Sequence, residues 1–428
     1  MTSNDWKKVT LGEISIDGKG SYGIAASAVE YSDDLYTYLR ITDINDDGTL
    51  NKIDLKSVND EKAKNYLLKP NDIVFARTGN STGRSYFYDG SDGELVYAGF
   101  LIKFSLDPTK VNPKFMRYYI LSNEYKGWVS SYSTGSTRRN INAKTYANME
   151  ILLPPRKQQD YLVDLLSPVD MKIETNNQII KKLEELAQAL YKQWFVDYEF
   201  PNENGEPYKS SGGEMVKSEL GLIPKAWKIG AIKDIGEVVG GGTPSKKQTD
   251  YYTSEGIPWI TPKDLSGFKN RYIERGAIDI TEKGYNNSSA KILPKGSVLF
   301  SSRAPIGYIA IASNEVSTNQ GFKSVVPYKG FGTEFVFQTL KSKLKTIKNR
   351  ASGSTFKEIS GGELKKIEVI LPSQEIINKF NQKTKILAEI ILNFEEQNKR
   401  LVNLRDTLLP KLISGEIRVS LEDEVLSK

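Results

Sequence analysis

The sequence contains the same long segment twice. The first copy begins at Gly135 with GSTRRNINAKTYANMEILLPP, and the second begins at Gly353 with GSTFKEISGGELKKIEVILPS. The offset between them is 218 residues, and it holds without a gap as far as Pro154 and Pro372. A repeat of this length exceeds the periods of roughly 20–50 residues that are typical of solenoids. It therefore indicates a duplicated domain, and two similar domains can bind two similar objects.

The composition limits the chemistry that this chain can perform. Its 428 residues are sufficient for two domains, each with a core of its own. It has no cysteine and no histidine, so thiolate ligands and the commonest general base near neutral pH are both missing. The net charge of +6 suits a polyanionic partner without requiring one. The polar N-terminal segment and the lack of a long apolar run predict a cytoplasmic chain with no membrane segment.

The two copies share an order of features ahead of the repeated segment. Each opens with a tryptophan, Trp6 or Trp227, which is followed by an apolar segment and a glycine-rich loop. A strand-like segment led by proline then ends in arginine, at Arg77 in the first copy and at Arg303 in the second. A helical stretch, the Gly-Ser-Thr loop and a final strand close each copy. This mixture of strands and helices predicts two similar mixed α/β domains.

Apolar residues at alternating spacings of four and three follow each copy, which is the pattern of a heptad seam. The first seam consists of Val169, Ile173, Asn176, Ile180, Leu183, Ala187, Leu190 and Trp194. The second consists of Leu387, Ile391, Phe394, Asn398, Leu401, Leu408 and Leu412, and Arg405 interrupts it. An asparagine in such a seam fixes the register of a helix pair. The pattern favours two paired helices over two surface helices, and Pro168 predicts the first turn of the first one.

The sequence offers no catalytic constellation. Residues 18–23 match G-x-G-x-x-G by letter, but no amphipathic helix follows them, and the second copy has three consecutive glycines at 240–242 instead. We find no Walker P-loop and no nuclease cluster of carboxylates with lysine. The residues therefore favour a binding protein over an enzyme.

Side chains suited to DNA contact gather in corresponding loops of the two copies. Arginine, asparagine and glutamine match the edges of guanine and adenine, while serine, threonine and lysine suit phosphates. The candidates in the first copy are Arg77, Thr78, Arg84, Thr137, Arg138, Arg139 and Lys144. Those in the second copy are Arg303, Lys323, Arg350, Thr355 and Lys357. Any one of them is more often ordinary solvated surface, but their joint occurrence in corresponding places favours DNA binding. The pattern does not reveal which bases are read.

Three further segments resemble the specificity subunit of a Type I restriction-modification system. Residues 189–201, ALYKQWFVDYEFP, are similar to the central segment of that family. Residues 218–227, SELGLIPKAW, resemble its entry to the second recognition domain, and residues 408–417, LLPKLISGEI, resemble its C-terminal segment. The resemblance covers essentially the whole chain. One departure is that the first copy starts at Trp6 without the Ser-Glu-Leu-Gly lead-in.

The resemblance implies an α+β fold in which two similar mixed α/β target-recognition domains are separated by two long antiparallel coiled-coil helices, as a pseudo-twofold repeat. The expected divisions are target-recognition domain 1 at 1–154, helical spacer 1 at 155–200, a linker at 201–225, target-recognition domain 2 at 226–372 and helical spacer 2 at 373–428. The linker segment is polar and rich in glycine, proline and serine, as connections between domains often are.

The resemblance also implies a function. Each domain would read one half of a bipartite, asymmetric sequence of double-stranded DNA, and the helices would set the spacer. The partners would be two methyltransferase subunits, docked on the helices, together with restriction/translocase subunits. S-adenosylmethionine, ATP and magnesium are expected on those partners, and this chain is expected to be non-catalytic and to bind no cofactor or metal. The residues expected to pair the helices or contact partners are Ile173, Asn176, Ile180, Leu183, Leu190, Trp194, Ile391, Phe394, Asn398, Leu401 and Leu408.

Two other classes of protein stay open. A fused nuclease-methyltransferase would bind S-adenosylmethionine as an isolated chain. A scaffold of duplicated domains would not bind duplex DNA even with partners present.

Overall fold

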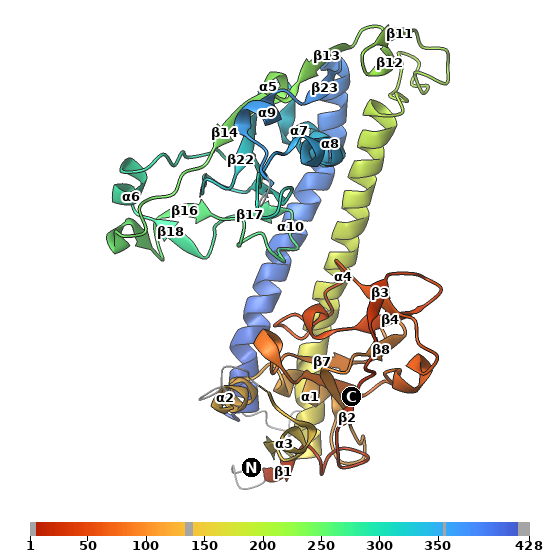
Figure 1. Cartoon of the computed structure of the whole chain (residues 1–428), viewed down its shortest axis with the longest axis vertical. Helices are drawn as coiled ribbons and strands as arrows, with labels where there is room; N and C mark the ends of the chain where they lie inside the picture. Colours follow the sequence, from red (N-terminus) through yellow and green to blue (C-terminus); the bar gives the residue numbers. More distant parts are fainter. Residues whose placement is uncertain (1–5, 133–139, 354–356, 418–428) are drawn as a thin grey trace, which may run out of the picture. The chain divides into compact units, whose positions relative to one another are not determined.

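The computed structural model describes residues 6–132, 140–353 and 357–417. The chain divides into two compact units, Met1–Ile173 with Leu401–Lys428, and Glu174–Arg400. Each unit holds one mixed α/β domain and a part of both long helices (Figure 1). The predicted α+β fold with two similar domains is therefore confirmed.

The domain of the first unit, called domain 1 below, contains two four-stranded sheets and a separate strand pair. In spatial order, the first sheet consists of β2 (Ser21–Tyr22), β9 (Leu101–Ser105), β6 (Asp72–Ala76) and β7 (Ser85–Tyr88). The second consists of β3 (Ala28–Glu30), β5 (Lys56–Val58), β4 (Tyr36–Leu39) and β8 (Leu95–Tyr97). The pair joins β1 (Lys7–Thr10) to β10 (Glu150–Leu153) in antiparallel register.

Short helices connect these strands. They are α1 (Pro113–Tyr119), α2 (Asn123–Ser131) and α3 (Ala143–Ala147), with 3₁₀ turns at Ile41–Asp43, Ala63–Tyr66 and Gly79–Ser81. Each of the three helices begins where a polar side chain accepts a hydrogen bond from the first turn. The side chain of Asn142, for example, accepts from the amide of Thr145 at 2.9 Å and starts α3.

The domain of the second unit, called domain 2, repeats this arrangement and adds one strand. Its larger sheet consists of β14 (Gly236–Gly240), β22 (Lys323–Pro327), β19 (Val298–Phe300), β20 (Ile309–Ala312) and the additional β17 (Tyr272–Ile273). Its smaller sheet consists of β15 (Tyr252–Thr253), β18 (Ile278–Ile280), β16 (Ile257–Ile260) and β21 (Ser317–Thr318). The separate pair joins β13 (Lys228–Ala231) to β23 (Glu368–Leu371).

The helices of domain 2 follow the same plan. They are α5 (Ile232–Ile235), α6 (Glu282–Asn286), α7 (Gly332–Ser342), α8 (Leu344–Arg350) and α9 (Gly361–Lys365), with a 3₁₀ turn at Thr249–Tyr251. Helix α9 corresponds to α3, because its capping residue Ser360 occupies the position of Asn142 at the offset of 218. The duplication therefore extends to the way in which individual helices are started.

Two helices of 40 residues follow the domains: α4 (Arg156–Phe195) and α10 (Gln374–Ile413). The prediction that Pro168 begins the first helix is wrong, since α4 begins twelve residues earlier and Pro168 lies inside it. An internal proline costs about 3 kcal/mol. Burial of Leu162, Val163 and Leu166 in the core of domain 1 offsets this cost, because it holds the turn before the proline in helical conformation.

The two helices pair antiparallel along the predicted seam in the second unit. The side chain of Asn176 on α4 donates to Gln397 Oε1 at 2.7 Å and to Asn398 Oδ1 at 2.8 Å, both on α10. Asn398 donates in turn to Asn177 at 2.8 Å. Both predicted seam asparagines thus bond across the pair, where a shifted register would leave their amides unpaired.

Each domain is anchored by the ends of both long helices. In the first unit, Leu409, Leu412 and Ile413 near the end of α10 are buried in one core cluster with residues at the beginning of α4. In the second unit, Tyr191, Trp194 and Phe195 near the end of α4 are buried with Phe380 near the beginning of α10. Burying a large apolar side chain stabilises by roughly 1.5–3 kcal/mol. Helices and domains therefore share continuous cores rather than touching at their surfaces.

The segment expected to be a linker is folded. It contains an antiparallel hairpin made of β11 (Met215–Ser218) and β12 (Gly221–Pro224). Phe200 stacks on Tyr208 with ring centroids 4.6 Å apart and on Trp227 at 4.7 Å. These aromatic contacts attach the segment to the core of the second unit.

A half-buried ion pair explains why arginine interrupts the second seam. Arg405 on α10 contacts Asp170 of α4 at 3.1 Å, and the two side chains are only 15% and 13% exposed. The hydroxyl of Tyr118 on α1 donates to the other oxygen of Asp170 at 2.8 Å. The carboxylate thus links α1, α4 and α10 within the first unit.

A second buried cluster attaches domain 2 to α10. Glu395 accepts hydrogen bonds from the backbone amides of Arg271 at 2.5 Å and Tyr272 at 3.0 Å, at the start of β17. The guanidinium of Arg271 pairs with Glu334 on α7. Burial is the main cause that raises the pKa of Glu395, the two backbone hydrogen bonds and the charge of Arg271 oppose the rise, and Glu184 on α4 adds to it; the resulting pKa is about 7.

We predict that Arg405→Met lowers the stability of the first unit by about 3 kcal/mol, because it leaves the Asp170 carboxylate buried without its cation. Hydrogen exchange of the amides around Asp170 measures this loss. Arg400→Met is the matched control, since the Arg400 side chain is 83% exposed and, among the residues that the structure describes, its ion pair is with Glu396 one turn away. It should cost less than about 0.5 kcal/mol. Equal losses in the two variants would contradict the assignment.

A second prediction concerns pH. The pKa of Glu395 is raised from 4.5, so the protonated carboxyl is favoured in the folded state. Its contribution to stability is fully present below pH 4.5 and is lost as the pH rises through about 7. Glu395→Gln has no titrating carboxyl, although its NH2 group cannot accept the second of the two amide hydrogen bonds at any pH. Between about pH 4.5 and pH 8, its free energy of unfolding, measured by urea denaturation, should therefore rise by roughly 3 kcal/mol relative to that of the unmodified protein. Glu396→Gln, which changes an exposed neighbour, should show no such pH-dependent gain.

Candidate nucleic-acid interface

One edge of domain 1 brings three separated segments together. Arg77 follows β6, and its backbone amide donates to the carbonyl of Phe100 at 3.0 Å. Its carbonyl accepts from the amide of Ile141 at 2.9 Å, and Thr78 pairs with Asn140 in a backbone bridge. The loop after β6, the loop before β9 and the segment leading into α3 therefore meet at this edge, which we call the β6 edge.

The side chain of Arg77 is held at the β6 edge by an aromatic ring. Its guanidinium carbon lies 5.1 Å from the centroid of the Tyr22 ring, and the Tyr22 hydroxyl accepts from the amide of Ala143 at 3.2 Å. The Nε atom of Arg77 is buried without a hydrogen-bond partner among the described residues. Lys144 follows Ala143 and is exposed. This arrangement provides a positioned cation, with a second cation nearby, of the kind that binds phosphates or guanine edges.

Arg84 has a structural role that the sequence did not reveal. Its Nε donates to Asp46 at 2.7 Å, and its Nη1 donates to the carbonyl of Ile44 at 3.2 Å. The guanidinium is thus engaged within domain 1, and contact with DNA would require it to release Asp46.

Domain 2 has the corresponding edge, which we call the β19 edge. The sequence analysis aligned Arg303 with Arg77, but in the structure Arg303 lies one residue beyond the position of Arg77. Ser302, not Arg303, occupies the position of Arg77, because its amide donates to Gly321 at 2.7 Å and its carbonyl accepts from Ile359 at 3.1 Å. Arg303 takes the position of Thr78 and pairs in a backbone bridge with Glu358. The segment from Pro294 to Arg303 is two residues longer than the segment from Pro70 to Arg77, and the sequence alone does not show how the two segments align.

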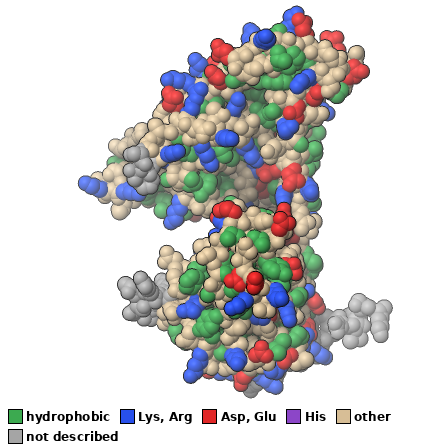
Figure 2. Space-filling model, turned by 45° about the vertical axis from the view of Figure 1, so that its right-hand side comes forward, with side chains coloured by type: hydrophobic (Ala, Val, Ile, Leu, Met, Phe, Trp, Pro, Cys, Tyr) green, Lys and Arg blue, Asp and Glu red, His purple; other side chains and the backbone are tan. Residues whose placement is uncertain are grey.

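Charged and amide side chains converge at the β19 edge. Glu358 lies 3.5 Å from Nη1 of Arg303 and 3.7 Å from Nζ of Lys323. Lys323 also donates to the carbonyl of Gln320 at 3.3 Å, and the side chain of Gln320 bonds to the hydroxyl of Thr243. Figure 2 shows Lys and Arg side chains among uncharged ones on the visible face of domain 2. The β19 edge can therefore present hydrogen-bond donors and acceptors, and side chains of positive and negative charge, to a ligand.

The remaining candidates divide into two groups. Arg350 ends α8, where its Nη1 donates to the carbonyl of Lys366 at 3.3 Å, and Lys357 is exposed next to Glu358. Thr137, Arg138, Arg139 and Thr355 lie outside the described residues. The sequence analysis did not identify Tyr22, Phe100 or Glu358 as residues of these edges. Glu358 could have been found from its place beside the second Gly-Ser-Thr loop, where it aligns with Asn140.

The predicted helix-pairing residues all lie on the covered side of α4 and α10. Asn176, Trp194 and Ile391 are buried. The others are half-buried: Ile173, Ile180, Leu183, Leu190, Phe394, Asn398, Leu401 and Leu408. By contrast, Leu186 and Ile386 on the same helices are 53% and 60% exposed. The helices therefore keep apolar side chains on a second face that the described chain does not cover.

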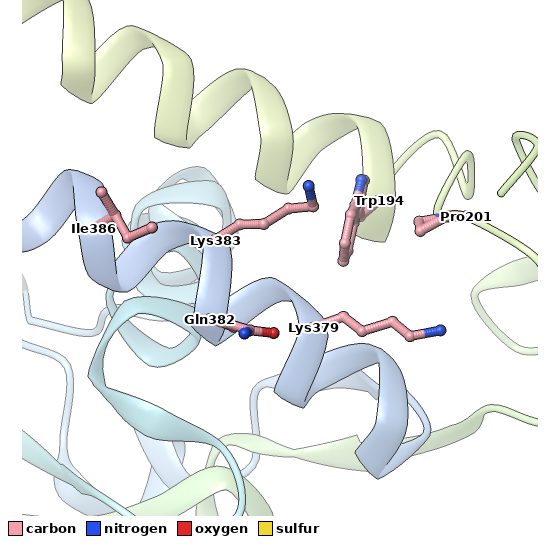
Figure 3. Close-up of a pocket in the computed structure, with 6 residues that line it drawn as sticks. All are labelled: Trp194, Pro201, Lys379, Gln382, Lys383 and Ile386. Atoms are coloured by element: carbon pink, nitrogen blue, oxygen red, sulfur yellow. The ribbon is translucent and has the colours of Figure 1, made fainter.

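A groove of about 280 Å³ lies in the second unit between the end of α4 and the beginning of α10. Figure 3 shows its six lining residues, Trp194, Pro201, Lys379, Gln382, Lys383 and Ile386. Lys379 and Lys383 extend from α10 toward the side on which Trp194 and Pro201 lie (Figure 3). The groove thus combines an aromatic surface with two cations.

Two properties of the described residues bear on other functions. No group of three or more acidic residues is placed to hold a metal ion in the part of the chain that the structure describes. Within residues 6–132, 140–353 and 357–417, no helix has the length and apolar character needed to cross a membrane.

Comparison with known proteins identifies the family. The family model described as "Type I restriction modification DNA specificity domain" matches residues 3–185 and 224–404. The chain belongs to this family and contains two copies of its domain, whose role is DNA target recognition. The two matched ranges each include one α/β domain, so the duplication in the sequence is a duplication of the recognition domain.

Individual relatives agree with this assignment. The Type I restriction enzyme HindI specificity subunit of Haemophilus influenzae is 28% identical over 97% of this chain and 100% of its own length. The MjaIX specificity subunit of Methanocaldococcus jannaschii is 44% identical over 190 residues, which is 44% of each chain. The crystal structure of the Type I restriction-modification S subunit from M. genitalium has a TM-score of 0.53 at 17% identity, covering 95% of this chain and 96% of that one. It shares the fold.

We predict that Arg77→Ala weakens DNA binding by the assembled complex about tenfold, since one positioned cation is lost, and that the salt dependence becomes shallower. Fluorescence anisotropy at several salt concentrations measures both. Arg84→Ala removes the same charge from the same domain but from a guanidinium held by Asp46, so it should change DNA affinity less. Equal effects of the two substitutions would show that the β6 edge has no special role.

Proposed function

We propose that each domain binds one half of a bipartite, asymmetric sequence in double-stranded DNA, through the β6 edge of domain 1 and the β19 edge of domain 2. One observation carries this proposal: the two edges share a backbone frame but carry different side chains. Arg77, Thr78 and Asn140 in domain 1 are replaced by Ser302, Arg303 and Glu358 in domain 2. The same frame with different donors and acceptors is suited to reading two different half-sites.

The long helices set the spacing between the half-sites in this proposal. The stretch of α4 between Leu166, which is buried in the core of domain 1, and Tyr191, which is buried in the core of domain 2, spans 25 residues. At 1.5 Å per residue this stretch is about 38 Å long, which is close to one turn of DNA, roughly 34–36 Å. Cross-bonded asparagines and a buried seam give the helix pair one register, which a spacer of fixed length requires. We therefore expect half-site centres about one turn apart.

We further propose that methyltransferase subunits, two in number, dock on the helices, and that restriction/translocase subunits join them. The exposed Leu186 and Ile386 and the groove beside Trp194 support a protein partner, because apolar side chains on a helix face that is otherwise charged favour burial. S-adenosylmethionine, ATP and magnesium would be bound by those partners. The chain itself would be non-catalytic, consistent with a sequence that has no histidine and no cysteine, and would act on DNA in the cytoplasm.

We predict that inserting one heptad after Gln178 and one after Glu396, at equivalent places in the two helices, lengthens the spacer and leaves both half-sites unchanged. Seven residues add about 10 Å, or about three base pairs. Methylome sequencing of cells that express the chain with its partners reads the motif directly. The unmodified chain should give two half-sites with a fixed gap.

The matched control is a heptad inserted between Glu219 and Leu220, in the turn of the β11–β12 hairpin, which should leave the gap unchanged. A single contiguous motif for the unmodified chain would contradict the bipartite proposal. Altered half-sites after insertion into the helices would contradict the spacer role.

A further inference from the structure

Glu358 occupies a position that recurs in both domains and that faces the same kind of edge. Glu358 forms a backbone bridge with Arg303, as Asn140 forms one with Thr78. An isoleucine follows each of them, Ile359 or Ile141, and is buried. The backbone at this position is therefore fixed in both domains, while its side chain is an amide in one and a carboxylate in the other.

The carboxylate of Glu358 is placed among donors but is not saturated by them. Arg303 Nη1 and the Ser302 hydroxyl lie 3.5 Å away, and Lys323 Nζ lies 3.7 Å away. Charge-assisted hydrogen bonds are usually 2.7–2.9 Å long, so these contacts are loose. The side chain is 36% exposed. An ionised carboxylate has about four acceptor sites, and several of them remain available for a ligand.

A carboxylate on a surface that binds DNA restricts what it can touch. It is repelled by phosphates, and the groups that can donate to it in the major groove are the N4 amino group of cytosine and the N6 amino group of adenine. Arg303 and Lys323 lie on either side of Glu358 and offset its charge, so the backbone of DNA can approach. In domain 1, the asparagine at the same position has the geometry to bond to adenine at N6 and N7.

We propose that Glu358 is a specificity-determining residue of domain 2, which accepts a hydrogen bond from the exocyclic amino group of a cytosine or an adenine in the half-site that this domain reads. Asn140 is its counterpart in domain 1. This inference rests on the proposed function. It goes further because it names one residue in each domain and the chemical group of the base that Glu358 recognises.

The test uses the complex assembled with its partner subunits and a set of duplexes that carry the wild-type motif. In each duplex, one adenine or cytosine of the domain 2 half-site is replaced by an analogue that lacks the amino group. The wild-type complex should lose about five- to 100-fold in affinity for one of these duplexes. The identity of that duplex distinguishes cytosine from adenine.

The variants Glu358→Ala and Glu358→Gln complete the comparison. Glu358→Ala should bind the natural and the analogue duplex with equal affinity, and Glu358→Gln should relax preference at the same base pair only. The half-site read by domain 1 should not change. Glu363→Gln is the matched control, because Glu363 lies on α9 in the same domain, its side chain is 43% exposed, and its ion pair within the described part of the chain is with Lys366.

Three results would overturn the inference. In the first, the wild-type complex binds every analogue duplex as tightly as the natural one, a result that can be obtained without any variant. Glu358→Ala could retain the full penalty for the missing amino group. It could also weaken all duplexes equally, which is the behaviour of a residue that only positions Arg303 and Lys323. A wild-type complex with no sequence preference at all would instead contradict the proposed function, before any variant is compared.

Discussion

The packing of the ends of α4 and α10 into the domain cores is the constraint on which the remaining structure depends. Tyr191, Trp194 and Phe195 are buried in domain 2 together with Phe380, and Leu409, Leu412 and Ile413 are buried in domain 1. A domain that shares its core with both helices cannot rotate on them without exposing large apolar side chains. The orientation of each DNA-binding edge relative to its own helix ends is therefore fixed by hydrophobic burial.

Polar contacts add specificity to this apolar framework. Asn176 bonds across the helix pair, Asp170 joins Arg405 and Tyr118, and Glu395 caps two amides at the start of β17. Buried polar groups of this kind cost free energy when they are mismatched, so they favour one register and one docking of each domain. The duplicated domains use different polar anchors, although their apolar anchors coincide at the offset of 218.

Much of the fold could be predicted from the sequence because hydrophobic periodicity records burial. The repeat predicted the duplicated α/β domain, and the heptad spacing predicted the seam that buries Ile391 and Ala187. Pro168 was misleading, since tertiary packing overrides local preference for a helix start. Arg405 interrupts the heptad pattern because it forms an ion pair with Asp170, and this pair could not be predicted because the two residues are far apart in the sequence.

The candidate site was less predictable, for a physical reason. Residue types alone indicated basic and polar loops, but which side chains are free for a ligand depends on contacts across segments. Arg84 is engaged by Asp46, whereas Arg77 lies on Tyr22. The equivalence of Arg77 with Ser302, and of Asn140 with Glu358, follows from backbone pairing that no spacing in the sequence reveals.

In the proposed function, each of the two domains reads its half of the DNA target independently of the other. The direct measurement is the methylated motif after residues 6–153, domain 1, are exchanged for the corresponding domain of another member of the family, with the helices and domain 2 retained. If the domains read DNA independently, one half-site changes to that of the donor while the other half-site and the gap stay the same. A change in both half-sites, or in neither, would contradict it.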